Sequence, residues 1–217
     1  MPDVHDLGGA SGFGAIPGIE GDFEYDERWE WTLMAVLRLG VKKGWYRTDA
    51  YRHAVERLPN EFYLHNAYFD RMLSGVTRAH IEAGIVTEDE IKAHLEDHVT
   101  IPAVKAMGPG HSGPAPTQTV RLQPGDSVRV RSPLPDGHVR APAYVRGHIG
   151  TILHCGRHAL AFPGEAGHRM DATSEFTYRV EFDRRSLWSD ALDDGAVVVD
   201  LSESYLELAE LQTQRRV

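Results

Sequence analysis

The sequence has little cysteine and no long apolar run. Its 217 residues include one cysteine, Cys155, which excludes an internal disulfide and any metal site built from several cysteines of this chain. No stretch approaches the roughly 18 uninterrupted apolar residues of a membrane-spanning helix. The N-terminus also lacks the basic and apolar segments of a secretory signal. We therefore expect a cytoplasmic protein without a structural disulfide.

Familiar catalytic motifs are missing as well. There is no GxSxG elbow, no phosphate-binding P-loop and no HExxH metal motif. His94 and His98 are four residues apart and could share a helix face, but no matching third ligand lies near them in the sequence. His154 and His158 have the same spacing in a region that favours a strand. We expect surface histidines, and a structural rather than nucleophilic thiol at Cys155.

The charge balance is acidic, with a formal net charge of −9. Most of the acidic excess lies in residues 1–100, and an acidic total argues against general nucleic-acid binding. The second half contains a local exception, in which two aspartates, Asp126 and Asp136, face a larger group of arginines. Those arginines are Arg121, Arg129, Arg131, Arg140 and Arg146.

The first 98 residues contain an arm and a helical domain. Residues 1–24 hold six glycines and few periodic apolar positions, so this arm cannot fold by itself. It is either a loose tail or an arm that orders against a partner through Leu7, Phe13 and Ile16. Residues 25–98 show helical spacing of apolar side chains.

Helix ends are indicated by residue type. Gly40 suits the C-terminal cap of a first helix, and Thr48 suits the N-cap of a second. A third helix is predicted to run from about residue 68 to Gly84. Thr87 followed by Glu90 forms a capping-box pattern for a short fourth helix.

A proline- and glycine-rich linker at 99–118 separates these helices from a domain with strand periodicity at 119–217. One predicted strand is FTYRVEF, whose aromatic and aliphatic residues lie on one face. Several such short strands joined by glycine-containing turns favour a small antiparallel barrel. The predicted class is α+β: an N-terminal extended arm and helical domain, then a small antiparallel β-barrel of the Src-homology type.

Two arginines are the best candidates for function. Arg52 lies on the predicted second helix, where it could simply pair with Glu56 four residues later. Arg140 lies among small and apolar residues in GHVRAPAYVRG and could simply be a turn residue at the barrel rim. A guanidinium grips a forked oxyanion with two parallel hydrogen bonds, so both arginines could alternatively bind an anion from another molecule.

Several motifs resemble the β subunits of nitrile hydratases. The start, VHDLGGASGFG, is similar to their N-terminal arm, and DAYRHAVERLPNEFY and NAYFDRM follow in the family's order. In the second half GDSVRVR, GHVRAPAYVRGHIGTI, TYRVEF and VVVDLSESYLE continue the match. The resemblance covers nearly the whole chain, and its specificity comes from several motifs in sequence.

The resemblance implies a division of labour. In the family, the α subunit carries a non-corrin cobalt(III) or iron(III) on cysteines, two of which are oxidised to sulfenate and sulfinate, and the β subunit binds no metal. By motif position, Arg52 and Arg140 match the β-subunit arginines that hydrogen-bond those oxygens, and Tyr68 matches a tyrosine beside the pocket. Substrate contacts are expected at Met34, Leu37, Val41 and Tyr46.

The function implied is hydration of nitriles to amides by an αβ enzyme, expected as α2β2, in which this chain is inactive alone. Phe69-Asp70-Arg71 departs from many cobalt-type relatives, and the sequence decides neither the metal nor the preferred nitrile. Three alternatives stay open: an activator or metal-delivery accessory protein, a thiocyanate-hydrolase-like subunit, and a barrel that binds nucleic acid. The unbroken linker disfavours the second, and the net acidity disfavours the third.

Overall fold

The computed structural model describes residues 4–12, 14, 25, 27–96, 100–108, 110, 122–135 and 137–209. The chain divides into two compact units. Unit 1 comprises Met1–Gly110 together with Ala166–Asp171, and unit 2 comprises His111–Glu165 together with Ala172–Val217. The return of residues 166–171 to the first unit is a feature that the sequence does not indicate. No helix in the described ranges has the length and apolarity needed to span a membrane.

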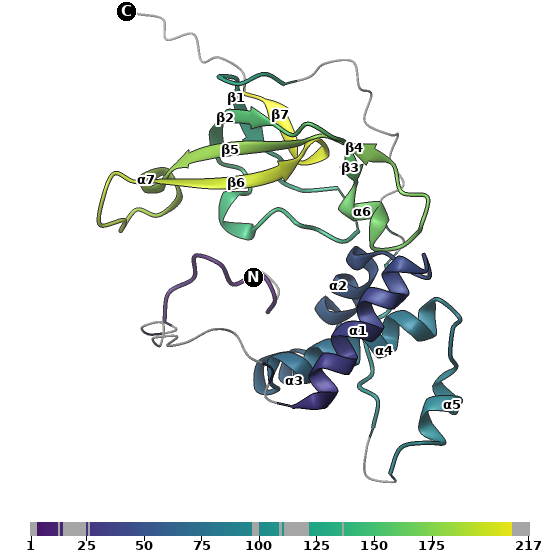
Figure 1. Ribbon diagram of the computed structural model, residues 1–217. Helices are drawn as coiled ribbons and strands as arrows, with labels where there is room; N and C mark the ends of the chain where they lie inside the picture. The colour runs from purple at the N-terminus through teal and green to yellow at the C-terminus, as the bar shows by residue number, and fades with distance from the viewer. Residues whose placement is uncertain are drawn as a thin grey trace, which may run out of the picture. The chain divides into compact units, whose positions relative to one another are not determined.

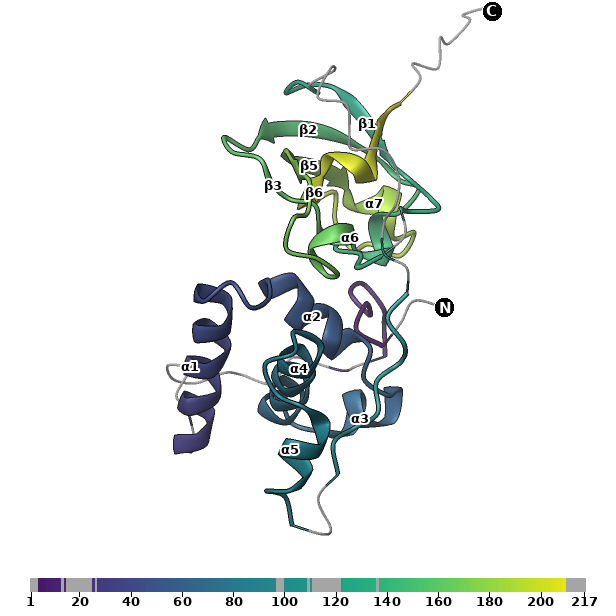
Figure 2. The same cartoon turned by 90° about the vertical axis from the view of Figure 1, so that its right-hand side faces the viewer.

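Unit 1 is helical, as predicted. Its helices are α1 (Arg28–Lys42), α2 (Thr48–Glu56), α3 (Asn60–His65), α4 (Tyr68–Glu82) and α5 (Glu88–Lys92). Helix α4 packs against both α1 and α2, and Figure 2 shows these three helices together. Apolar residues at helical spacing on α1 and α4 form the core, joined by one tyrosine from the α1–α2 turn: Leu33, Leu37, Tyr46, Met72, Val76 and Ala79.

The helix ends agree with the sequence only in part. The capping box of α5 is confirmed, because the Thr87 backbone N–H donates to Glu90 at 2.7 Å and the Glu90 N–H donates to the Thr87 hydroxyl at 3.2 Å. Gly40 is not a cap: α1 continues to Lys42, and Gly40 is buried against Tyr46, whose Cζ would lie 2.5 Å from an added Cβ. Thr48 is the first helical residue rather than the N-cap, which is Arg47.

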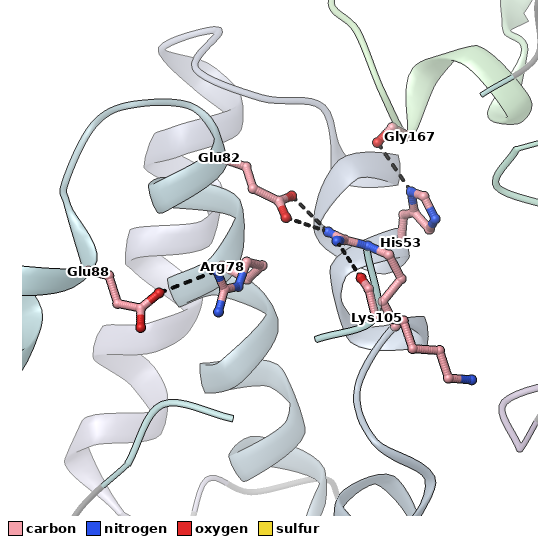
Figure 3. A network of polar contacts seen from close by, with 7 residues as sticks. His53, Arg78, Glu82, Glu88, Lys105 and Gly167 are labelled. Atoms are coloured by element: carbon pink, nitrogen blue, oxygen red, sulfur yellow. Dashed lines mark hydrogen bonds and ion pairs between the residues drawn. The ribbon is translucent and has the colours of Figure 1, made fainter. Parts of the chain in front are cut away.

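A buried ion pair joins α2 to α4. Arg57, 6% exposed, follows the last turn of α2, and its Nη2 lies 2.7 Å from both carboxylate oxygens of Glu82 on α4. Its Nη1 donates to the Lys105 carbonyl at 3.2 Å (Figure 3). The Arg57 guanidinium therefore connects the end of α2 to α4 and to the segment around Lys105.

Residues 166–171 are held in unit 1 by backbone carbonyls that accept from α2 and its N-cap. Arg47 donates to the Met170 carbonyl through both Nε, at 3.0 Å, and Nη2. His53 Nδ1 lies 3.5 Å from the Gly167 carbonyl (Figure 3), and its ring packs against that of His168 with centroids 4.7 Å apart. These contacts account for the place of a segment from the second half of the sequence in the first unit.

Unit 2 contains a five-stranded antiparallel sheet in the order β6-β5-β2-β1-β7. The strands are β1 (Ser127–Val130), β2 (Ile149–Cys155), β5 (Thr177–Asp183), β6 (Ala196–Ser202) and β7 (Leu206–Leu208). Figure 1 shows β2, β5 and β6 side by side. A two-stranded ladder of β3 (Leu160–Ala161) and β4 (Ser174–Glu175) accompanies the sheet. Short helical turns complete the unit: η1 (Ala143–Val145), α6 (Pro163–Ala166), α7 (Arg184–Leu187) and η2 (Glu203–Tyr205).

The face alternation predicted for FTYRVEF is confirmed. Tyr178, Val180 and Phe182 are each 0% exposed on β5, and their neighbours Arg179 and Glu181 are exposed. The mixed helix-and-sheet class is therefore correct.

The closed barrel is wrong, because the described residues form an open sheet and the Src-homology type is not confirmed. Strand β6 turns through the three residues of η2 directly into β7, which pairs with β1 at the far end of the strand order. Strands β6 and β7 are therefore the two edges of the sheet.

The arm is described in part. Leu7 is half-buried, and its carbonyl accepts from Ala10 N–H at 3.0 Å. The other two expected anchors, Phe13 and Ile16, lie outside the described residues, as do residues 99, 109 and 111–118 of the 99–118 linker. The boundaries drawn from composition at 1–24, 25–98 and 119–217 stay predictions.

Glu82→Gln is expected to destabilise the protein, because it leaves the buried Arg57 guanidinium without its carboxylate. Removing one partner of a buried pair costs about 3–5 kcal/mol, and because the Glu82 side chain is 28% exposed we expect about 3 kcal/mol. Glu88→Gln is the control, because the exposed carboxylate of Glu88 lies 3.7 Å from Arg78 and 2.8 Å from Lys92, and ion pairs of an exposed carboxylate contribute little to stability (Figure 3). Urea unfolding of both variants measures the difference, and equal losses would contradict the importance of the buried pair.

A second expected effect concerns pH. Glu175 on β4 is 3% exposed, and its Oε2 accepts from the Ser204 N–H at 3.1 Å and the Ser204 hydroxyl. Burial raises the pKa of Glu175 to about 7, although the hydrogen bonds from Ser204 act in the opposite direction. The folded chain then holds this proton at pH values where the unfolded chain has lost it.

This carboxyl therefore contributes stability at acidic pH that is lost as the pH rises from about 4.5 to about 7. Glu175→Gln keeps an oxygen to accept from Ser204 and does not titrate. Thermal unfolding between pH 5 and pH 8 should show a smaller decline for Glu175→Gln than for the wild type. An unchanged pH dependence would disprove the role of Glu175.

Candidate functional site

Arg52 projects from the exposed side of α2. The helix buries Ala54 and leaves the Arg52 side chain 47% exposed. The ion pair predicted with Glu56 is instead made with Asp49, one turn earlier, at 3.8 Å. A contact of that length between partly exposed groups contributes little free energy. The expected role of Arg52 in binding an anion of another molecule stays a prediction.

Tyr68 lies in the same neighbourhood. It is the first residue of α4 and is 58% exposed. The turn before it is held by Asp70, whose carboxylate accepts the Ala67 N–H at 3.2 Å. Burial raises the pKa of the Tyr51 phenol to about 12, with Tyr68 raising it further and Arg52 lowering it. Both side chains therefore lie within electrostatic range of the same phenol on α2.

The four residues expected to contact substrate lie in or beside the helical core. Leu37 and Tyr46 are buried, at 9% and 4% exposure, and Met34 and Val41 are partly buried against them. The Tyr46 hydroxyl lies 3.5 Å from His80 Nδ1, and burial raises its pKa to about 12. Tyr46 also borders a cleft of about 420 Å³ within unit 1. Their role as substrate contacts stays a prediction.

Arg140 belongs to unit 2 and is exposed between two buried residues, His138 and Ala141. Its backbone N–H donates to the Tyr205 hydroxyl at 3.2 Å, and that hydroxyl lies 3.5 Å from the His138 carbonyl. Tyr205, 1% exposed, thus holds the backbone on both sides of position 139. The Arg140 side chain starts from a fixed backbone position.

The neighbouring arginines of the predicted positive patch have partners within unit 2. Arg129 donates to the Gly147 carbonyl at 2.8 Å, and Arg146 donates to the Ala141 carbonyl at 2.8 and 3.1 Å. Arg131 pairs with Glu207 at 3.0 Å. These three arginines therefore make local structural contacts within unit 2.

Among the described residues, no group of three or more His, Cys, Asp and Glu side chains is arranged to hold a metal ion. His94, His154 and His158 are exposed, and His98 lies outside the described ranges. Cys155 is partly buried beside the sheet core, with its Sγ 3.5 Å from the Gly156 carbonyl.

Comparison with protein families gives two matches that together span most of the chain. The model described as nitrile hydratase beta subunit, N-terminal, matches residues 1–120, and the one described as nitrile hydratase beta subunit, C-terminal, matches residues 90–208. The two candidate arginines fall in different halves of this match.

Individual relatives agree along their whole length. The chain is 38% identical to nitrile hydratase subunit beta of Pseudomonas chlororaphis, covering 96% of each protein. It is 36% identical to the Rhodococcus erythropolis subunit, covering 96% of this chain and 100% of the relative. A low-molecular weight cobalt-containing nitrile hydratase subunit beta of Rhodococcus rhodochrous is 28% identical over 95% of this chain and 99% of its own.

A solved structure of thiocyanate hydrolase from Thiobacillus thioparus is 28% identical over 42% of this chain and 78% of its own, with a TM-score of 0.38. A TM-score this low supports no conclusion about the fold or function of this chain. The two family models and the full-length relatives, in contrast, agree in every part of the chain. The chain belongs to the nitrile hydratase β-subunit family.

Proposed function

We propose that this chain works with an α subunit, in an αβ pair or its dimer, and that Arg52 and Arg140 hydrogen-bond oxidised cysteine oxygens of that partner. Its family makes it a subunit of a lyase that hydrates nitriles to amides. The observation that carries the proposal is the continuous match over both halves of the chain, each of which contributes one exposed candidate arginine.

The implied metal would be held by the α subunit. Two relatives are named as cobalt-containing, whereas the choice between cobalt and iron for this enzyme rests with the partner. When bound, a trivalent cobalt or iron would act as a Lewis acid on the nitrile nitrogen. The side chain of this chain that fits such a centre is Arg52, an exposed guanidinium whose ion pair to Asp49 is long.

The guanidinium groups have a specific task. A guanidinium offers five N–H donors in a planar fork and stays charged at every working pH. Two parallel hydrogen bonds to a sulfenate or sulfinate keep the oxyanion ionised and fix its direction. They also shield sulfur at an oxidation level from which further oxidation is irreversible. Arg52 and Arg140 would thereby aim the oxyanions at the nitrile carbon.

Tyr68 contributes a hydroxyl from the same edge as Arg52. Its ring is held edge-on to Phe69, with centroids 5.1 Å apart, and its side chain is largely exposed. In the assembled enzyme this phenol would donate a hydrogen bond beside the reacting nitrile. Met34, Leu37, Val41 and Tyr46 would supply the apolar side of the substrate path. Water added across the carbon–nitrogen triple bond gives the amide.

Arg52→Lys and Arg140→Lys are expected to lower turnover sharply while the αβ complex still assembles. Each lysine keeps the charge and loses the fork, and a charge-assisted hydrogen bond is worth about 1.5–3 kcal/mol, which corresponds to about a ten- to hundredfold lower rate. Co-expression with the α partner, followed by size-exclusion chromatography and a nitrile hydration assay, measures both properties.

The controls are Arg38→Lys on α1 and Arg157→Lys after β2, two exposed arginines outside the proposed site. Both should retain wild-type turnover. The isolated chain should show neither nitrile hydration nor bound metal. Wild-type turnover in either Arg52→Lys or Arg140→Lys would remove that arginine from the mechanism.

An accessory role is less well supported. An activator resembling part of a β subunit would match the relatives over a fragment, whereas this chain aligns over 96% of its length. Stoichiometric co-purification with active enzyme separates the two roles, because an activator leaves the finished enzyme and a subunit stays in it.

A further inference from the structure

The cleft in unit 1 is a second candidate binding site, which shares Tyr46 with the proposed substrate path. Its walls come from the α1–α2 turn, α2, the end of α4 and residues 166–170. Its volume of about 420 Å³ lies within the range of about 300–1,000 Å³ typical of small-molecule sites. Figure 3 labels two of its lining residues, Glu82 on α4 and Gly167.

The cleft combines apolar walls with a cationic edge. Trp45, Tyr46, Met107 and Met170 supply aromatic rings and flexible thioethers that adapt to an apolar body. Arg47 and Arg169 supply guanidinium groups. Such a combination favours a ligand with one charged end and one apolar end.

Among the described residues, the one carboxylate that lines the cleft is already engaged. Both oxygens of Glu82 lie 2.7 Å from Arg57 Nη2, which approaches from the protein interior. Glu82 is thereby neutralised, and Arg169 pairs with Asp171 at 3.6 Å. The positive charge that remains at the described cleft wall is that of Arg47.

Arg47 is the residue best placed to grip an anion. Two of its five N–H donors are used on the Met170 carbonyl, and no carboxylate in the described ranges pairs with it. It is also the N-cap of α2, whose side chain makes no capping bond. The positive end of the nine-residue helix therefore adds to the guanidinium charge.

We propose that this cleft binds a small carboxylate with an apolar or aromatic body, through the remaining N–H donors of Arg47. The carboxylate would meet Arg47 and the first turn of α2, and its body would lie against Trp45 and Tyr46. The site uses neither Arg52 nor Arg140, so it does not depend on the proposed catalytic role of those residues.

Calorimetric titration of the assembled αβ complex with benzoate tests the site, with nitrobenzene as the neutral analogue of the same shape. Benzoate should bind with a dissociation constant of about 0.1–1 mM, more weakly at high salt, and nitrobenzene should bind at least about tenfold more weakly. Arg47→Gln should weaken benzoate binding about ten- to hundredfold, and the matched control Arg38→Gln should leave it unchanged.

Two further variants distinguish binding in the cleft from binding at the nitrile site. Ala83→Leu adds side-chain volume at the cleft wall without replacing an arginine and should block benzoate, even though residues 166–171 keep their contacts with Arg47. Arg52→Lys should leave benzoate binding intact. Binding that is lost in Arg52→Lys but kept in Arg47→Gln would place benzoate at the nitrile site and overturn the proposal, as would equal affinity for benzoate and nitrobenzene or no binding to the wild type.

Discussion

The packing of α2 against α4 is the constraint on which the helical unit depends. Gly75 on α4 lets the two helices approach so closely that an added Cβ would lie 3.2 Å from the Tyr51 ring and closer still to Val55. The Arg57–Glu82 pair then closes the end of the same interface. Arg52 lies on α2 and Tyr68 is the first residue of α4. The separation of these two side chains therefore depends on the packing of α2 against α4, through the contact at Gly75 and the buried Arg57–Glu82 pair.

In the second unit, the backbone at Arg140 is held by hydrogen bonds to a buried tyrosine rather than by helix packing. Arg140 lies in a segment outside the strands, where no ladder fixes the backbone. Tyr205, buried at the η2 turn between β6 and β7, reaches this segment through its hydroxyl and contacts the backbone at Arg140 and His138. A buried phenol whose hydroxyl finds polar partners is stable in an apolar core, so the turn that leaves the sheet open also anchors the arginine.

Local patterns predicted the elements well because their causes are local. The spacing of Leu33 and Leu37 and the alternation of Tyr178 and Phe182 each report one buried face. The Thr87–Glu90 capping box needs only four residues to form. Gly40 failed as a cap because its neighbour in space is Tyr46, whose position depends on the whole unit.

The remaining misses are tertiary. The sequence of residues 166–171 contains no pattern that predicts hydrogen bonds from Arg47 and His53 to their carbonyls. The choice of Asp49 over Glu56 by Arg52 is likewise a matter of side-chain placement. The sheet is open because the chain passes from β6 through η2 into β7, and β7 pairs with β1 at the other edge of the sheet. Strand periodicity alone does not specify this pairing. The two candidate arginines were chosen through family motifs, because residue spacing alone does not separate a binding arginine from one with a structural contact, such as Arg129 or Arg131.

One short helix connects the two functions assigned to unit 1. Arg47 caps α2 and Arg52 lies five positions further along it, so the cleft and the proposed catalytic edge share a single rigid element of nine residues. A carboxylate on the remaining N–H donors of Arg47 would place a negative charge at the N-terminal end of α2, which its helix dipole favours. The other end of α2 is held to α4 by Arg57. Arg52 therefore lies on a helix that is anchored on both sides of it.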